Sequence, residues 1–133
     1  GINQLKRINS LNSKRFLASK YYSKQLEEIS GIITPEIFRK KEHTYHLYII
    51  RIKNEFGQNR DEIFKELKKV GIQVSLHYKP LHRFSAYKHL TKTYGRLDNS
   101  EQIYKESLSL PLYPSISKKQ QDLVINNIKN YKV

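Results

Sequence analysis

With 133 residues, 38% of them hydrophobic, the chain has the length of one domain with a modest core. It contains no cysteine, which excludes disulfide bonds and thiolate chemistry and fits a reducing compartment such as the cytoplasm. The formal net charge of +13 suits a polyanionic partner such as a nucleic acid, an acidic membrane or a phosphorylated small molecule, although lysines that are merely solvated would give the same charge.

Residues 2–30 are predicted to form one long amphipathic helix, with a stop at Gly31. Apolar residues recur along it at helical spacing and define a single stripe. The stripe comprises Leu5, Ile8, Leu11, Ala18, Tyr22, Leu26 and Ile29. Because the helical pattern begins without a cap or the apolar core of a signal peptide, we expect the chain to be part of a longer polypeptide. No apolar run approaches the ~20 residues that a membrane span needs.

The middle of the chain is predicted to contain a central strand and a capped helix. A connector over residues 32–44 leads into the stretch HLYIIRIK at residues 46–53, which is apolar on both faces and suits a strand with neighbours on both sides. Asn59 and Glu62 have the spacing of a capping box, and the helix that they open ends at Gly71.

Two shorter strand patterns follow, separated by helical segments. Apolar and polar residues alternate over residues 72–77 and again over residues 108–112, where the strand must lie at an edge or end at its proline. Helical spacing and capping-box spacing predict three more helical segments. They are residues 84–94, a short helix that Asp98 and Glu101 cap, and a final helix that Ser117 and Gln120 cap.

This order of elements predicts an α+β fold. Each strand is reached through a helix or a long loop, and two-residue hairpins are absent, so we expect an α/β sandwich. In it, helices cover a small, mostly antiparallel sheet of about three strands, within one domain over residues 1–133.

The stretch VSLHYKPLH, residues 74–82, ends a strand pattern in a cluster of polar side chains. His77, Tyr78, Lys79 and His82 surround a proline, and such a loop at the carboxyl end of a strand is suited to face an anion or a sugar. A solvent-exposed polar turn explains the same pattern equally well.

Other kinds of site find weaker support. The five histidines do not combine with carboxylates at ligand spacing, so no metal site is predicted. The sequence has neither a nucleophile elbow nor a glycine-rich phosphate loop. Ten tyrosines among many lysines are compatible with a basic nucleic-acid-binding module, and a stand-alone interaction domain without catalysis is a further alternative.

Several motifs resemble the C-terminal part of the DegT/DnrJ/EryC1/StrS family of PLP-dependent nucleotide-sugar aminotransferases. The family pattern is G-I-x-x-x-x-H-Y-x-P-L-H, an aromatic residue, and then S-L-P-L-x-P. This chain matches it from Gly71 to His82, at Tyr87, and from Ser109 to Pro114. The strand motif HLY and the opening helix GINQLKRINSLNSKR agree as well, so the resemblance covers nearly the whole chain.

The resemblance implies the C-terminal, small domain of a larger fold type I enzyme, with residues 1–30 as the helix that links it to a large domain. In the family, the large domain carries the Schiff-base lysine and most cofactor contacts. We therefore expect neither catalytic nor cofactor-binding residues in this chain, which alone would be inactive. Lys79 lies between a tyrosine and a proline on a solvated rim and is a poor substitute for that lysine.

By the same resemblance, the loop at residues 74–82 lies at the mouth of an active site. The substrate-binding residues would be His77, Tyr78, Lys79 and His82, and the loop-shaping residues Pro80 and Tyr87. The intact enzyme would use PLP to transfer an amino group, from an amino acid such as glutamate, to a keto-sugar nucleotide for cell-surface glycan synthesis. It is expected to be a cytoplasmic homodimer that binds neither membranes nor nucleic acids. The HYKP form of the loop is similar to that of enzymes that aminate 4-keto-6-deoxy hexoses on UDP.

Overall fold

The fold is built on a three-stranded antiparallel sheet with the strand order β1-β2-β3. The computed structural model describes residues 1–36, 43–87 and 95–132. The strands are β1 (Ile32–Ile33), β2 (Tyr48–Ile52) and β3 (Ser107–Leu110). The helices are α1 (Ile2–Lys6), α2 (Ile8–Leu26), α3 (Arg60–Lys69), α4 (Asp98–Glu106) and α5 (Lys118–Asn130). Three 3-10 turns are η1 (Asn54–Phe56), η2 (Leu81–Arg83) and η3 (Ser85–Tyr87). The α+β class and the antiparallel sheet predicted from the sequence are confirmed.

β2 occupies the centre of the sheet because both of its edges are paired. Its register aligns Ile52 with Ile32 of β1 and Tyr48 with Leu110 of β3. Alternate residues of β2 are buried, and every residue of β3 is buried. As predicted, β3 ends directly before its proline, which has no N–H to continue the ladder.

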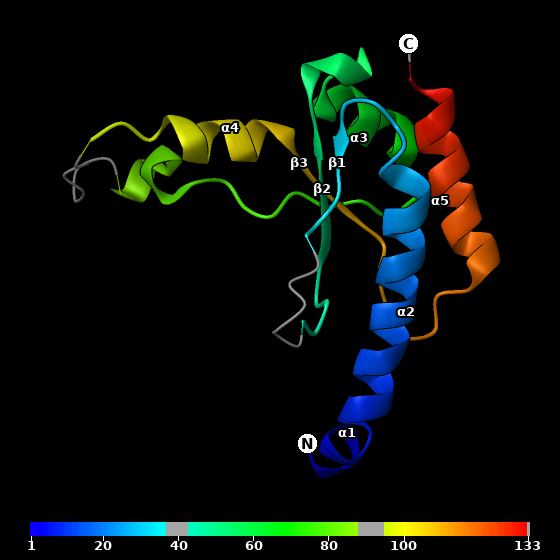
Figure 1. The fold of residues 1–133 in the computed structure, drawn as a ribbon. Coiled ribbons are helices and arrows are strands. Elements are labelled where there is room, and N and C mark those ends of the chain that lie inside the picture. Colours follow the sequence, from blue (N-terminus) through cyan, green and yellow to red (C-terminus); the bar gives the residue numbers. More distant parts are fainter. Residues whose placement is uncertain (37–42, 88–94, 133) are drawn as a thin grey trace.

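Helices α2, α3 and α5 lie together on one side of the sheet and enclose the core, whereas α4 extends away on the other side (Figure 1). Two tyrosines lie within this core, and the rings of Tyr22 and Tyr48 are stacked with centroids 5.1 Å apart. The Tyr22 hydroxyl donates to the backbone oxygen of Pro111 (3.2 Å), and the Tyr48 hydroxyl shares a hydrogen bond with Ser23 (2.9 Å). Burial raises the pKa of both tyrosines, so both stay neutral at physiological pH.

The N-terminal helix is interrupted, whereas the sequence pattern predicts one helix over residues 2–30. The backbone departs from helical geometry at Arg7 (φ −106°, ψ 0°), which separates α1 from α2, and α2 ends at Leu26. α1 has no buried residue and Leu5 is 66% exposed, while the apolar stripe is buried only from Ala18 onwards. A short helix with no buried residue gains little from packing and is only marginally stable, which agrees with the break at Arg7.

The strand predicted over residues 72–77 is reduced to a single bridge between Ser75 and Ser109, so the prediction of a full strand is wrong. The alternation in the sequence reflects the burial of Ile72 and Val74 against the core rather than continuous backbone pairing. Conversely, β1 lies in the segment interpreted as a connector, because a strand of two residues is too short to show a period.

Two of the three predicted capping boxes are formed. The pairs Asn59–Glu62 and Ser117–Gln120 exchange side-chain and backbone hydrogen bonds at the starts of α3 and α5. The third prediction is wrong: α4 begins at Asp98 after Leu97, which makes no side-chain cap, and the Glu101 carboxylate binds side chains from another segment. Spacing alone therefore identified the local caps but could not exclude a competing tertiary partner.

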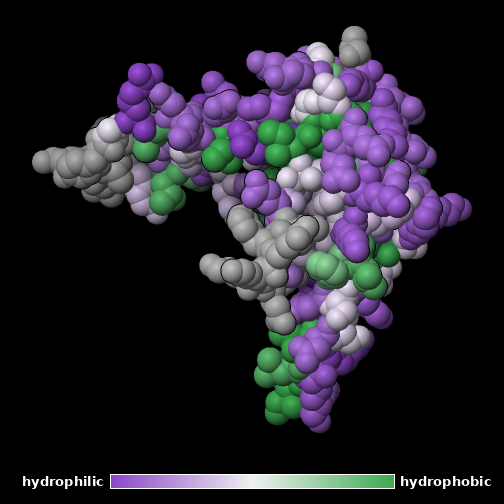
Figure 2. Space-filling model, in the orientation of Figure 1, coloured by the Kyte–Doolittle hydropathy of each residue, from purple (hydrophilic) through white to green (hydrophobic). Residues whose placement is uncertain are grey.

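The surface is mostly hydrophilic in the view of Figure 2, with hydrophobic residues gathered over α1 at one end of the molecule. In that region, Ile2, Leu5 and Ile8 are 73%, 66% and 44% exposed. None of the helices in the described part of the chain combines the length and the apolar composition that a bilayer span requires.

Candidate functional site

The predicted substrate-facing residues lie on a loop that leaves the sheet beside β3 and runs toward α4 (Figure 1). We call residues 77–83 the rim loop. It follows the bridge in which the backbone of Ser75 donates to Ser109 (3.2 Å) and accepts from it (2.9 Å), and it ends in the turn η2. The start of the rim loop is thereby fixed to the edge of the sheet.

His77 is half-buried and lies against β3. Its Nδ1 shares a hydrogen bond of 2.7 Å with Oγ of Ser109, which is itself only 4% exposed. The imidazole also meets the ring of Tyr78 edge-on, with centroids 4.6 Å apart. Because Nδ1 is engaged by the serine, Nε2 is the ring nitrogen left to meet a further partner.

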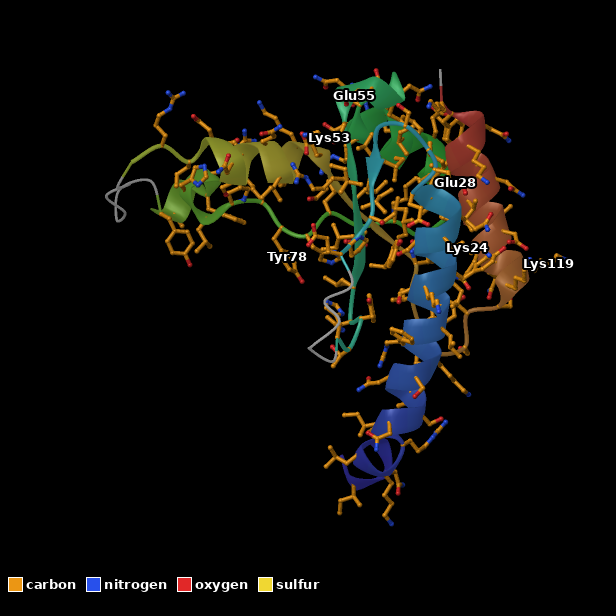
Figure 3. The ribbon with its side chains drawn as sticks, viewed as in Figure 1. Lys24, Glu28, Lys53, Glu55, Tyr78 and Lys119 are labelled. Carbon is orange, nitrogen blue, oxygen red and sulfur yellow. The ribbon has the colours of Figure 1, made fainter. Side chains whose placement is uncertain are left out.

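Tyr78 and Lys79 form the exposed part of the rim loop. Tyr78 is 74% exposed, and Figure 3 shows it on the segment that leaves the sheet, away from α2 and α5. The Nζ atom of Lys79 lies 5.1 Å from the centroid of the Phe84 ring, in a cation–π contact. A phenol and an ammonium group are thus presented from neighbouring positions, and these groups suit the hydroxyls and phosphates of a ligand.

Pro80 and Tyr87 lie in the turns that follow. Pro80, with φ −58°, opens η2, and its backbone oxygen accepts a hydrogen bond of 2.9 Å from the backbone of Arg83. Tyr87 belongs to η3 and packs edge-on against Phe84, with ring centroids 6.4 Å apart. Of the helical segment predicted over residues 84–94, the described part consists of an extended Phe84 followed by η3; residues 88–94 lie outside the described residues.

His82 belongs to an ion cluster on α4 and does not share the partner of His77. Its Nε2 is 2.5 Å from Oε1 of Glu101, and Arg83 pairs with both oxygens of the same carboxylate, with Nε 2.8 Å from Oε1. The hydrogen bonds from Arg83, and then the one from His82, hold the pKa of Glu101 below its usual range. The guanidinium group of Arg83 also lies 5.3 Å from the centroid of the Tyr104 ring.

A second ion cluster fixes the other end of α4 to the sheet. The carboxylate of Glu106 accepts hydrogen bonds from Arg51 (2.9 Å), Lys53 (2.8 Å) and Gln102 (3.0 Å). Burial acts to raise the pKa of Glu106, but the hydrogen bonds from Lys53, Arg51 and Gln102 outweigh it, so that the pKa is lowered. Because α4 passes directly into β3, this cluster joins both elements to β2.

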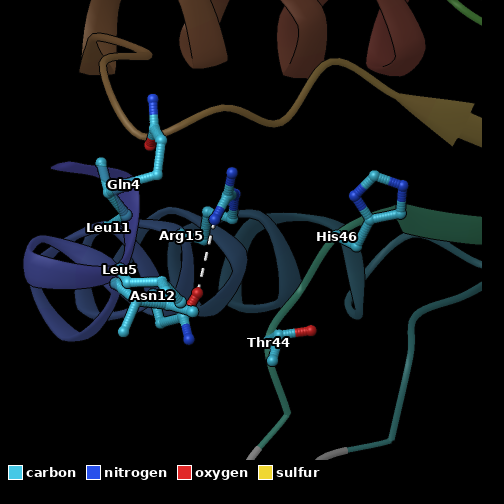
Figure 4. A pocket seen from close by; sticks show the side chains of 8 residues that line it. Gln4, Leu5, Leu11, Asn12, Arg15, Thr44 and His46 are labelled. Carbon is cyan, nitrogen blue, oxygen red and sulfur yellow. Dashed lines mark hydrogen bonds between the residues drawn. The ribbon is translucent and has the colours of Figure 1, made fainter. Parts of the chain in front are cut away.

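A groove of about 290 Å³ lies elsewhere, between α1, the start of α2 and the residues before β2 (Figure 4). Its lining residues are Gln4, Leu5, Ile8, Leu11, Asn12, Arg15, Thr44 and His46. The groove continues the exposed hydrophobic region over α1, and none of the substrate-binding residues predicted from the sequence lines it.

Lys79 on the rim loop and Glu101 at its attachment to α4 are both engaged by other side chains, so neither is placed as a PLP site requires. Such a site needs a lysine that can carry the cofactor and a carboxylate for the pyridine nitrogen. Lys79 is exposed and lies over Phe84, and the carboxylate of Glu101 is already engaged by His82 and Arg83. Among the residues that the structure describes, no three His, Cys, Asp or Glu side chains gather as metal ligands would.

The structure adds three residues that the sequence patterns did not assign to the site, namely Ser109, Arg83 and Glu101. They meet the rim loop or one another across 18 to 32 positions of sequence, which no local pattern reveals. One weak signal exists for Ser109, because a serine in the middle of an apolar strand needs a polar partner once it is buried.

The sequence matches the DegT/DnrJ/EryC1/StrS aminotransferase family over residues 1–129. The UDP-4-amino-4,6-dideoxy-N-acetyl-beta-L-altrosamine transaminase of Campylobacter jejuni is 36% identical over 93% of this chain and 33% of its own length. Helicobacter pylori PseC, an aminotransferase involved in the biosynthesis of pseudoaminic acid, superimposes with a TM-score of 0.89 at 25% identity, over 99% of this chain and 35% of that one. A putative sugar aminotransferase of Streptococcus pneumoniae in its PLP form gives a TM-score of 0.84 at 29% identity, over 99% of this chain and 34% of that one. The chain thus spans about a third of the length of the relatives that it matches.

Proposed function

We propose, on the premise that this chain belongs to the DegT/DnrJ/EryC1/StrS aminotransferase family, that it is the C-terminal domain of an enzyme that transfers an amino group to a keto-sugar nucleotide. The observation that carries the proposal is the match of nearly the whole chain, residues 1–129, to that family. The similarity to a sugar-nucleotide transaminase over 93% of the chain supports the same reaction class.

In this proposal, the rim loop faces the nucleotide sugar. Lys79 provides a positive charge for the diphosphate, and the hydroxyl of Tyr78 is exposed and able to bond sugar hydroxyls. His77 is held by Ser109 in one orientation, which suits a group that must meet a particular substrate oxygen. His82 would contribute at the end of the loop through its place beside Glu101.

PLP supplies the electron sink of transamination when it is bound in this family's enzymes. In line with the resemblance to this family, in which a large domain carries the Schiff-base lysine, we assign its binding to residues outside this chain. The part of this chain in the reaction is to bind and orient the sugar nucleotide. On its own, the chain would then be inactive.

The finer assignment concerns the substrate and the amino donor: we propose a 4-keto-6-deoxy hexose linked to UDP as the substrate and glutamate as the donor. The name of the Campylobacter jejuni relative, which is 36% identical, supports a UDP-linked dideoxy amino sugar as the product. We further propose that the intact enzyme is a homodimer in the cytoplasm and serves glycan biosynthesis. The absence of cysteine is compatible with that compartment.

The proposal is tested with the protein expressed from its complete coding sequence. The enzyme is incubated with PLP, glutamate and a UDP-linked 4-keto-6-deoxy hexose, and a dTDP-linked keto sugar serves as the matched control. Mass spectrometry is expected to show amination of the UDP sugar. Amination of the dTDP sugar alone would overturn the finer assignment. Amination of neither, together with salt-sensitive binding to short RNA, would support a nucleic-acid-binding function instead.

A further inference from the structure

The rim loop is attached at two points, and both attachments lead to the same stretch of chain. At its start, His77 bonds to Ser109, on β3 (2.7 Å). At its end, His82 and Arg83 bond to Glu101, on α4 (2.5 and 2.8 Å). Since α4 continues into β3 without an intervening residue, one continuous helix and strand carries both partners.

This stretch is itself fixed to the rest of the fold. Glu106 is bonded to Arg51 and Lys53, and it stands just before the first residue of β3. Tyr104 lies under two guanidinium groups, those of Arg60 and Arg83, each 5.3 Å from its ring centroid. Arg60 is only 5% exposed and donates to the backbone oxygen of Ser107 (2.9 Å), so α3 also holds the junction between α4 and β3.

Between the two attachments lie two exposed side chains with functional groups, Tyr78 and Lys79. A loop that is fixed at only one end samples many backbone conformations, whereas a loop fixed at both ends loses most of that freedom before a ligand binds. The attachment at Glu101 is therefore the one that turns a free extension into a closed loop.

We infer that Glu101 is a positioning residue, which fixes the C-terminal end of the rim loop so that Tyr78 and Lys79 are held ready for the nucleotide sugar. The inference rests on the proposed function, because it takes the sugar nucleotide as the ligand of this loop. Its role is exerted through its hydrogen bonds with His82 and Arg83.

A carboxylate is needed at this position because both of its oxygens accept from cations or from an imidazole. In Glu101→Gln, an amide nitrogen replaces one of these oxygens and faces a donor. Asp122→Asn is the matched control, since Asp122 lies on α5 and accepts from Tyr21 of α2 and from Lys118, both of which lie outside the rim loop. Arg83→Gln is a second variant, which keeps the carboxylate and removes its guanidinium partner.

The experiment compares these variants in the complete enzyme. We expect Glu101→Gln to raise KM for the nucleotide sugar about tenfold or more, while the half-reaction with the amino donor alone, followed by cofactor absorbance, stays unchanged. Trypsin is expected to cut the Arg83–Phe84 bond several times faster in Glu101→Gln, as measured by mass spectrometry of the peptides. Asp122→Asn should change neither quantity, and Arg83→Gln should reproduce the rise in KM.

Two results would overturn the inference: an active Glu101→Gln enzyme with unchanged KM for the sugar, or an equal loss in both half-reactions together with a lower melting temperature. If Glu101→Gln does not fold, an unchanged KM for the sugar in Arg83→Gln would overturn the inference instead. A wild-type enzyme without aminotransferase activity would refute the proposed function, whereas the rate of tryptic cleavage would still decide whether Glu101 fixes the loop.

Discussion

His77 and Ser109 share a hydrogen bond of 2.7 Å across 32 positions of sequence. In the complete enzyme, we expect His77→Ala to lower kcat/KM for the sugar nucleotide about 10- to 100-fold, because a lost hydrogen bond to a substrate is worth about 1–3 kcal/mol. The free energy of unfolding should fall by only about 1 kcal/mol, for the lost bond to Ser109. Steady-state kinetics and urea denaturation measure the two effects.

Ser109→Ala separates these effects, because it removes the same hydrogen bond but keeps the imidazole. Ser109→Ala should lower the free energy of unfolding by about as much as His77→Ala does, but it should lower kcat/KM less. Equal losses of stability in both variants with unchanged kinetics would show that His77 has a structural role only.

Gly31 lies against the backbone of Phe56. It adopts φ +84°, and an added Cβ would stand 2.2 Å from the Phe56 nitrogen. We expect Gly31→Ala to lower the free energy of unfolding by about 2–5 kcal/mol, from left-handed strain plus displacement of packed backbone. Gly71 is the matched control, because it adopts φ +78° with no atom within 4 Å of a Cβ. Gly71→Ala should lower the free energy of unfolding by about 1–2 kcal/mol. If urea denaturation shows equal losses for Gly31→Ala and Gly71→Ala, the close contact with Phe56 does not matter and the prediction is wrong.

Acid should weaken the attachment of α4 to the sheet. The pKa of Glu106 is lowered in the folded protein, so its ionised form stabilises the fold above the unfolded pKa of about 4.3, and this contribution is lost as the pH falls through the folded pKa. The stability difference between wild type and Glu106→Gln should therefore be largest near pH 7 and shrink below about pH 4. Glu28→Gln, at an exposed position, is the control in urea denaturation across this range. A difference independent of pH would contradict the prediction.

Lys79 should not carry the cofactor. The lysine is exposed, and its Nζ atom is engaged in a cation–π contact with the ring of Phe84. The 133-residue chain mixed with PLP, reduced with borohydride and digested should show no stoichiometric adduct at Lys79. Any labelling should be scattered over exposed lysines such as Lys24 and Lys119, which are labelled in Figure 3.

The exposed hydrophobic residues of α1 should make the isolated 133-residue chain self-associate or fray at its N-terminus. Ile2 and Leu5 are 73% and 66% exposed, and Leu5 lines the groove of Figure 4. Leu5→Lys should reduce the concentration dependence of the sedimentation coefficient, whereas Leu123→Lys, a 54% exposed position on α5, should do so less. A monomeric chain with α1 fully protected from hydrogen exchange would contradict this expectation.

Local signals in the sequence were sufficient where the structure depends on neighbours along the chain. The capping boxes at Asn59 and Ser117 are formed within one helical turn, and the central strand needed only its apolar run. Glu101 shows the limit: its spacing from Asp98 fits a cap, but the carboxylate binds His82 and Arg83 instead. These partners lie 19 and 18 positions away, and the competition between a local cap and distant side chains is decided by tertiary structure.

The same limit applies to the residues around His77. The sequence motif brings His77 and Tyr78 together because they are neighbours, and it places a proline before the turn. It does not show that the histidine turns toward a serine of another strand, because the pairing of residues 72–77 with β3 is reduced to one bridge. The substrate-binding roles of the rim loop stay predictions until they are measured.

Because α4 passes directly into β3, the register of the strand and the rotation of the helix about its axis depend on each other. The strand is set in register by Tyr48 opposite Leu110 and by Arg51 opposite Ser107, so the rotation of the helix before it is set as well. One residue inserted or deleted between Glu101 and Ser107 would turn the carboxylate by about 100° around the helix axis while the strand kept its pairing. The length of this segment, and not only its composition, therefore determines whether the loop on the far side of the helix is held.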